Sequence, residues 1–195
     1  MQNESKIYVV RHGQTDANVA GLTHSYTDTY GLNETGREQA REVAKSLENV
    51  KFDKVFSSPL RRARETACII AGTDNIIIDE RITERNFGEF EGLKLQPFEE
   101  CEFDLKSFFD ASTPQQYESA ETIHAAEQRV HAFLDDIRHR YRGKNILVVT
   151  HGAIGAHYKT YIFGRPADGK YYKDTRLYMK NCEVFEIENG KILTG

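Results

Sequence analysis

Two short, largely apolar runs in this chain each lead directly to a histidine followed by glycine. They are residues 7–10, followed by Arg11-His12-Gly13, and residues 146–150, followed by His151-Gly152. Runs of this kind are typical of strands that are buried on both faces of a parallel sheet. Parallel sheets gather ligand sites where their strands end, at the carboxyl edge. We therefore expect the two histidines to share one pocket, with Arg11 ready to bind an anion.

Strand and helix patterns alternate along the rest of the chain. Strands are predicted at residues 54–57 and 76–78, and helices over roughly 121–141 and from 152 to about 163. Near the end, Asn189-Gly190 separates the apolar runs 182–188 and 191–193, which predicts a hairpin. Such alternation favours an α/β fold with a mostly parallel sheet.

Two further helices carry explicit start signals. The spacing from Thr35 to Glu38 fits a capping box, and it precedes an apolar stripe at positions 40, 43, 44 and 47. Ser58-Pro59 fits an N-cap followed by the first helical residue, opening a helix that runs to Gly72.

Residues 84–120 lack this regular alternation, and glycines and prolines punctuate them. We interpret them as an excursion over the carboxyl edge of the sheet, with a short helix near 103–109. The whole chain, 1–195, is expected to be a single domain, since 195 residues suit one core.

Composition excludes several classes of protein. The net charge is −4, so the chain has no generally basic surface for nucleic acid. The three cysteines are scattered without a CxxC motif, which argues against a disulfide framework or a thiolate zinc site. No apolar run approaches a membrane span. We expect a cytoplasmic protein that binds neither nucleic acid nor membrane.

The candidate pocket has the composition of a phosphate site. A helix that carries Arg61, Arg62 and Arg64 begins just after the strand at 54–57, and helix N-termini and arginine both favour phosphate. A neutral imidazole such as that of His12 is a competent nucleophile toward phosphorus. Glu84, which follows the third strand, is placed to protonate the leaving group and then to activate water.

Five segments resemble, in order, the motifs of the histidine phosphatase superfamily, the phosphoglycerate-mutase-like group. They are residues 10–18 (VRHGQTDAN), 32–40 (LNETGREQA), 57–67 (SSPLRRARETA), 84–92 (ERNFGEFEG) and 150–152 (THG). The resemblance covers nearly the whole chain. It implies a three-layer α/β/α sandwich whose sheet includes one antiparallel strand, for which residues 182–188 are the candidate.

The resemblance also implies residue roles. His12 would form a phosphohistidine, Glu84 would donate the proton, and Arg11, Arg62 and His151 would contact the phosphoryl oxygens. The residues expected to help bind the substrate are Asn18, Gly13, Thr15 and Gly152. No metal and no cofactor is implied. Arginines beside the histidines would repel a cation, which makes a two-histidine metal site the weaker interpretation.

The predicted function is hydrolysis of small-molecule phosphomonoesters. Three alternatives remain: a cofactor-dependent phosphoglycerate mutase, a metal-dependent hydrolase, and a protein that binds a phosphorylated ligand without turnover. The stretch 84–128 contains many carboxylates, including Glu99, Glu100 and Glu102, but only one arginine, Arg85. Lying over the pocket, it would repel a second anionic group, so phosphoglycerate is expected to be a poor substrate.

Histidines outside the motifs are expected to pack or to face solvent. These are His24, His124, His131, His139 and His157. Arg61 and Arg64 are likewise expected to be charges on a helix surface.

Overall fold

The computed structural model describes residues 5–94, 109–112, 118–171, 176–188 and 190–194. Within these ranges, a single mixed sheet has the strand order β3-β2-β4-β1-β5-β6. The strands are β1 (Lys6–Arg11), β2 (Lys54–Ser57), β3 (Ile77–Ile78), β4 (Asn145–Thr150), β5 (Val184–Glu186) and β6 (Lys191–Thr194). The first four are parallel, whereas β5 runs antiparallel to β1 and pairs with β6 as a hairpin. The mostly parallel sheet and its antiparallel strand are therefore confirmed.

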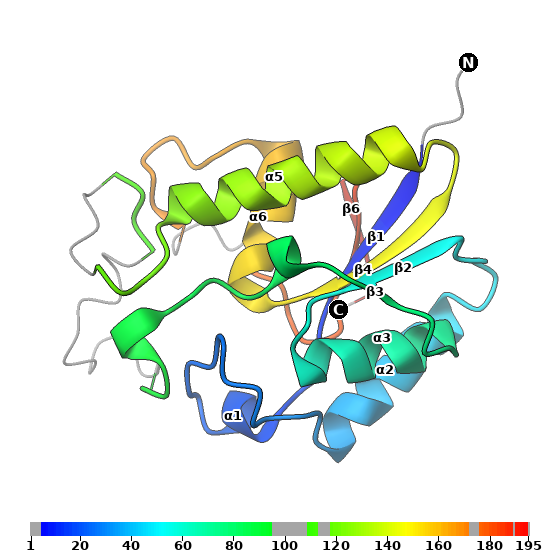
Figure 1. Ribbon diagram of the computed structural model, residues 1–195, viewed down its shortest axis with the longest axis horizontal. Coiled ribbons are helices and arrows are strands. Elements are labelled where there is room, and N and C mark those ends of the chain that lie inside the picture. The colour runs from blue at the N-terminus through cyan, green and yellow to red at the C-terminus, as the bar shows by residue number, and fades with distance from the viewer. Residues whose placement is uncertain (1–4, 95–108, 113–117, 172–175, 189, 195) are drawn as a thin grey trace.

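Helices cover both faces of the sheet (Figure 1). Helices α2 (Glu34–Ser46) and α3 (Arg61–Ala71) pack on the face that carries Tyr8 and Val10. Helices α5 (Ile123–Arg140) and α6 (Gly152–Phe163) pack on the opposite face, which carries Ile7 and Val9. Alternate residues of β1 thus enter two separate cores, because successive strand side chains point to opposite faces. This is the expected three-layer α/β/α sandwich. The prediction of a single domain for residues 1–195 stays a prediction.

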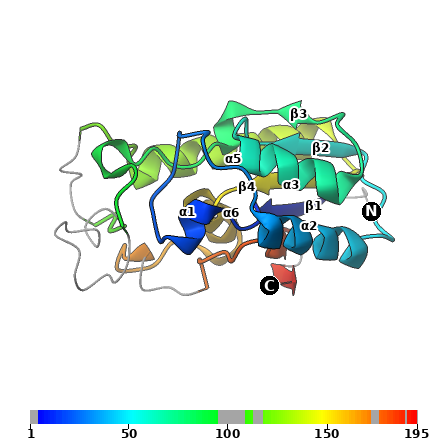
Figure 2. The same cartoon turned by 90° about the horizontal axis from the view of Figure 1, so that it is seen from below.

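The register of β1 against β4 decides where the two histidines lie. Arg11 is paired with Thr150, and the His12 N–H donates to the Thr150 carbonyl at 2.9 Å. Both strands end at this point, so His12 and His151 leave the same edge of the sheet side by side. Helix α1 (Asp16–Val19) and the described parts of the excursion lie at this edge, away from the N-terminus (Figure 2).

The N-cap residues predicted for α2 and α3 were both wrong. Asn33, not Thr35, caps α2: its side-chain oxygen accepts from the Gly36 N–H at 2.9 Å, and Thr35 is exposed in the first turn. Helix α3 begins at Arg61, not after Ser58, and its N-cap residue makes no side-chain hydrogen bond. Instead, the Arg61 N–H donates to Asp28, a residue distant in the chain.

The predicted strand at 76–78 is shorter and more exposed than its apolar sequence suggested. Only Ile77 and Ile78 form β3, which pairs with β2 at the edge of the sheet. Their side chains are 37% and 45% exposed. An apolar run alone does not distinguish an edge strand from a central one. Among the described residues, β3 has a neighbouring strand on one side only.

Other expectations agree closely with the structure. The long helix predicted at 121–141 is α5, and two short 3₁₀ turns, η1 (Glu80–Ile82) and η2 (Gly88–Phe90), flank Glu84. The short helix predicted near 103–109 lies outside the described residues, except for Phe109. Among the helices described, none is both long and apolar enough to cross a membrane.

The reassigned cap of α2 leads to a paired prediction. Asn33→Ala removes the acceptor of the Gly36 N–H, so we expect it to lower the free energy of unfolding by about 1 kcal/mol. Thr35→Ala, two residues along, removes an exposed hydroxyl without a capping role and should change that free energy by less than about 0.5 kcal/mol. Urea denaturation of both variants measures the difference. A larger loss for Thr35→Ala would restore the capping-box assignment.

Candidate active site

His12 is a buried histidine whose tautomer is defined by its surroundings. It is 2% exposed, and its Nδ1 lies 2.7 Å from the carbonyl oxygen of Gly13. A carbonyl can only accept, so Nδ1 carries the proton and Nε2 keeps its lone pair. Burial, together with the positive charges of Arg62 and Arg11, holds the pKa of His12 well below its usual value. The imidazole is therefore neutral at neutral pH, with Nε2 available as a nucleophile.

His151 lies against His12, with 5.2 Å between the ring centroids. Its Nε2 is 2.7 Å from the hydroxyl oxygen of Ser58. We assign the Ser58 hydroxyl proton to the bond with Nε2, an orientation that also lets Ser58 Oγ accept the Leu60 N–H at 3.3 Å. Neutral His151 then carries its own proton on Nδ1. Burial and Arg62 lower the pKa of His151 well below its usual value. Ser58 is thus a partner of a site histidine rather than the predicted helix cap.

Two arginines are held beside these histidines by backbone carbonyls. Arg62 is fully buried, and its terminal nitrogens donate to the carbonyls of His24 and Ser25 at 3.0 Å and of Thr27 at 3.3 Å. Burial lowers the pKa of Arg62 to about 10, so the guanidinium stays charged at neutral pH. Arg11 donates through Nη1 to the Met179 carbonyl at 2.7 Å.

Three N–H groups around His12 have no partner. They are Nε of Arg11, Nε of Arg62 and Nδ1 of His151, and each is buried without a hydrogen bond among the described residues. Buried donors are normally paired, so three orphans at one place call for an explanation. An anion with several acceptor oxygens is the kind of partner that such donors lack.

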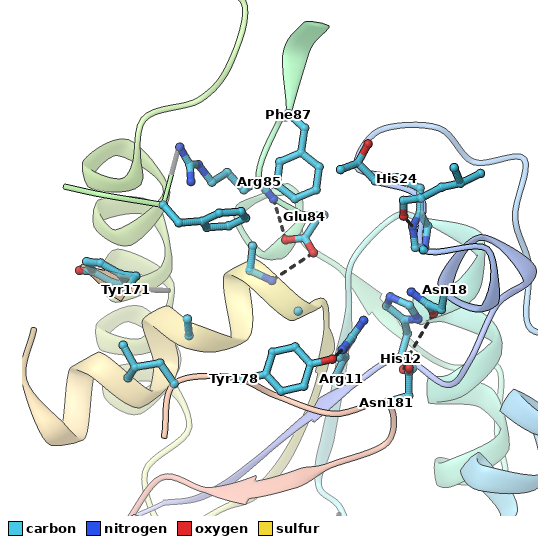
Figure 3. Close-up of a pocket in the computed structure, with 18 of the residues that line it drawn as sticks. Arg11, His12, Asn18, His24, Glu84, Arg85, Phe87, Tyr171, Tyr178 and Asn181 are labelled. Carbon is cyan, nitrogen blue, oxygen red and sulfur yellow. Dashed lines mark hydrogen bonds between the residues drawn. The ribbon is translucent and has the colours of Figure 1, made fainter. Parts of the chain in front are cut away.

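Glu84 occupies the opposite side of the cavity. It is 6% exposed, and its carboxylate accepts from the N–H groups of Arg85 at 2.9 Å, Ala153 at 3.2 Å and Ile154 at 3.1 Å. The last two belong to the first turn of α6, whose free N–H groups favour an acidic partner. The start of α6 therefore fixes the orientation of Glu84 toward the cavity (Figure 3).

Asn18 and Thr15 form a small scaffold around α1. Thr15 is fully buried and makes a reciprocal capping box with Asn18. The side-chain oxygen of Asn18 also accepts from Asn181 at 3.2 Å, and Asn181 donates to the His12 carbonyl at 2.9 Å. Asn18 lines the cavity but Thr15 does not. Thr15 therefore positions Asn18 and does not itself face the cavity.

The two glycines that follow the histidines allow close approaches. A Cβ on Gly13 would lie 2.4 Å from the Gly36 carbonyl oxygen, so only glycine fits between β1 and α2. Its N–H already donates to Thr66 at 3.1 Å. Gly152 lines the cavity, and a Cβ there would lie 3.2 Å from the guanidinium of Arg11. Gly13 therefore positions the backbone, whereas Gly152 leaves space beside Arg11.

The sequence analysis missed His24, Asn181 and Ser58. His24 was assigned to packing or solvent, yet it lines the cavity and stacks edge-on against His12 at 5.8 Å. Burial, with a contribution from Arg62, lowers the pKa of His24 to about 4. No local pattern marks His24 or Asn181, because both reach the site through tertiary contacts. Ser58 lies in the motif at 57–67, but its pattern predicted a helix cap.

A buried ion pair supports the segment that contacts Arg11 and Asn18. Lys159 of α6 and Glu183 are 0% and 4% exposed and lie 2.6 Å apart. Lys159 also donates to the Tyr178 carbonyl at 2.7 Å, and Glu183 accepts the Lys180 N–H at 3.2 Å. The pair thereby fixes residues 178–183, which supply the Met179 carbonyl and Asn181.

The cavity in front of these groups has a volume of about 760 Å³. Among the predicted site residues, Arg11, His12, Asn18, Glu84 and Gly152 line it. Arg62 and His151 are fully buried and are not among the residues that line the cavity. The described residues contain no cluster of three or more histidine, cysteine or acidic side chains that could hold a metal. The arrangement is a neutral histidine in a cationic pocket, facing a carboxylate.

Comparison with known proteins identifies the family. Residues 7–191 match the histidine phosphatase superfamily (branch 1), so the chain belongs to that superfamily. Phosphoglycerate mutase-like protein 4 of Arabidopsis thaliana is 34% identical over 195 residues, which cover 95% of this chain and 81% of that protein. The superfamily comprises phosphatases and mutases, which places this chain in an enzyme family of that kind.

Solved structures agree with this assignment. The phosphoserine phosphatase of Entamoeba histolytica, in complex with 3-phosphoglyceric acid, superimposes with a TM-score of 0.79 at 26% identity, covering 96% of this chain and 93% of that one. YhfR of Bacillus stearothermophilus gives a TM-score of 0.79 at 28% identity, with 96% and 94% covered.

The buried histidines predict a pH-dependent stability. His12, His24, His151 and His157 all have lowered pKa values, to about 4 for His24 and about 3 for His157. Below pH 6.5 the unfolded chain binds protons that the folded chain does not. The free energy of unfolding should therefore fall as the pH falls, by up to about 1.4 kcal/mol per pH unit for each histidine.

Urea unfolding at pH 7.5, 6 and 5 tests this dependence. His157→Gln should show a shallower slope than the unsubstituted protein, because one of the four groups is gone. His139 lies exposed on α5, so His139→Gln should keep the full slope. A free energy of unfolding that stays constant from pH 7.5 to 5 would contradict the burial of neutral imidazoles.

Proposed function

We propose that the protein hydrolyses phosphomonoesters through a phosphohistidine on His12, without a metal. The observation that supports this most strongly is the set of three unpartnered donors around a neutral histidine with a free Nε2. A transferring phosphoryl group spreads its charge over three equatorial oxygens. Nε of Arg11, Nε of Arg62 and Nδ1 of His151 would stabilise that charge, as preorganised donors do in other phosphoryl and acyl transfers.

In the first step, Nε2 of His12 attacks phosphorus and the ester P–O bond breaks. In this scheme Glu84 enters the first step as the neutral acid, and the departing alkoxide takes its proton and leaves as the alcohol. In the second step, Glu84 removes a proton from water, which attacks phosphorus. The P–N bond breaks, inorganic phosphate forms, and His12 and Glu84 return to their starting states. Asn18 and Gly152 border the phosphoryl site in this scheme.

A phosphoglycerate mutase is the second candidate, and the name of the Arabidopsis relative favours it. The predicted acidic cover, Glu99, Glu100 and Glu102, lies outside the described residues. The described lining of the cavity instead combines Arg85 and Lys94 with Glu84. The charge argument against phosphoglycerate therefore has no support in the described lining. Two assays separate the candidates. Release of inorganic phosphate indicates a phosphatase, whereas interconversion of the two phosphoglycerates indicates a mutase.

The proposed nucleophile gives the first functional prediction. His12→Ala should lower kcat/KM for any phosphomonoester by at least about 10⁴-fold, because the covalent route is lost. Acid-labile phosphate should also disappear from the protein after a rapid quench. Substitution of the exposed His139 by alanine serves as the matched control and should leave both readouts unchanged.

These assays are best run in EDTA. Full activity of the unsubstituted protein in the chelator supports the metal-free scheme, and a requirement for an added divalent cation would contradict it. Label that persists on the His12→Ala protein would remove His12 from the covalent role. Binding of phosphate esters without any release of phosphate would favour the alternative of a ligand-binding protein.

The proposed acid gives the second prediction. Glu84→Gln should slow phosphoenzyme formation from alkyl phosphates by about 10²- to 10⁴-fold, since the poor leaving group needs a proton. Aryl phosphates, whose leaving groups need little protonation, should lose much less in the same step. Single-turnover rates with both classes measure the contrast, and Glu89→Gln, at an exposed position, is the control. Equal losses for both classes would exclude proton donation by Glu84.

A further inference from the structure

The cavity continues well beyond the phosphoryl site. It runs along α6 into a second region, which we call the distal recess. Its described walls are Phe87, Phe109, Ile123, Ala156, His157 and Tyr171. Figure 3 shows Tyr171 and Phe87 on the far side of Glu84 from His12 and Asn18. A volume of about 760 Å³ for the whole cavity is in the range that binds drug-sized ligands, far more than a phosphoryl group needs.

Small residues on α6 line the part of the cavity that leads from the phosphoryl site to the distal recess. Within residues 151–160, only Gly152, Ala153 and Ala156 are partly exposed, and all three line the cavity. Every other residue of this stretch is buried. The side of α6 that faces the cavity is therefore nearly flat backbone, against which a planar group can lie.

The wall of the recess formed by Tyr171 is rigidly held. Its hydroxyl donates to Glu127 at 3.2 Å, and Glu127 is 1% exposed. Glu127 also accepts from Thr160 at 3.1 Å and forms an ion pair with Arg165. Because the hydroxyl of Tyr171 is already hydrogen-bonded, the aromatic ring is the part of Tyr171 that can contact a ligand in the cavity.

His157 supplies a polar group without a partner. It is 2% exposed, lines the recess and lies 5.8 Å from the Tyr171 ring. Its Nδ1 is buried and makes no hydrogen bond with any described residue. Burial and Arg85 lower the pKa of His157 to about 3, so the ring is neutral and can exchange one hydrogen bond with a neutral ligand.

Several charged groups next to the recess are paired with one another. Arg129 pairs with Glu121 at 2.7 Å, and the Nε of Arg85 donates to the Glu121 carbonyl at 2.7 Å. Glu121 and Glu84 both act on the charge of Arg85. Two arginines thus face two carboxylates beside the recess, and Lys94 adds a positive charge to the lining of the cavity.

We propose that the distal recess binds the alcohol part of the substrate, and that this part carries an uncharged, largely apolar ring. The apolar walls, the flat side of α6 and the unpartnered nitrogen of His157 together specify such a group. The inference rests on the proposed phosphatase function and adds a substrate class to it. The ring lies against Ala156 and Tyr171, and a heteroatom on it bonds to His157.

Three primary alkyl phosphates test this inference: propyl phosphate, 3-phenylpropyl phosphate and the phosphate ester of 4-hydroxybutyrate. Their leaving groups are chemically alike, so differences in kcat/KM report on the recess. Burial of the phenyl ring should raise kcat/KM over propyl phosphate by about 10-fold or more. The carboxylate ester should not exceed propyl phosphate.

Ala156→Leu fills the recess and should lower the phenylpropyl-to-propyl ratio at least about fivefold. Ala44→Leu makes the same change on α2, outside the cavity, and should preserve the ratio. A ratio near one in the unsubstituted protein would overturn the inference, as would preference for the carboxylate ester. Equal losses for both esters in Ala156→Leu would also overturn it, because the recess would then not distinguish them.

Release of phosphate from propyl phosphate tests the proposed function on its own. If no ester is hydrolysed, that function fails, and calorimetric binding of the same esters to the His12→Ala protein still tests the recess. The role of His157 is measured with the three pyridylpropyl phosphates. At least one isomer should exceed 3-phenylpropyl phosphate, and His157→Phe should abolish that advantage. No advantage for any isomer would remove His157 from recognition.

Discussion

The parallel pairing of β1 with β4 is the constraint on which the rest of the site depends. Its register ends both strands at the same level, so two histidines 139 positions apart in the sequence leave the sheet as neighbours. Helix α6 can begin at once after His151, and its first N–H groups then hold Glu84. A slip of the register would separate the imidazoles and move the carboxylate with them.

The structural features that the sequence predicted correctly are those that depend on a local pattern of residues. Apolar runs located the strands, and their ends located His12 and His151. Glu84 and Arg62 were found because motifs mark them. Start points of helices were less predictable, since Asn33 and Thr35 are both good caps and only tertiary packing chooses between them.

Residues that reach the site through distant contacts were not predicted. His24 meets His12 through a loop whose carbonyls bind Arg62 and whose Ser25 and Thr27 bind Glu91. Lys159 and Glu183 are ordinary charged residues in the sequence, and their pairing requires the return of the chain after α6. Such groups become buried only when the sheet and its helix layers pack together. A short window of sequence therefore does not predict their burial.

Helix α6 has one further consequence. Its first turn orients the carboxylate of Glu84, its middle carries Ala156 and His157, and Lys159 near its end secures the segment beside Arg11. These parts belong to one rigid element, with a rise of about 1.5 Å per residue. Residue 153 holds the Glu84 carboxylate and residue 156 lines the recess. Helical geometry therefore sets their separation at about 4.5 Å along the helix axis. For the ring-bearing substrate that we propose, this fixed separation would select the length of the linker between the ester oxygen and the ring.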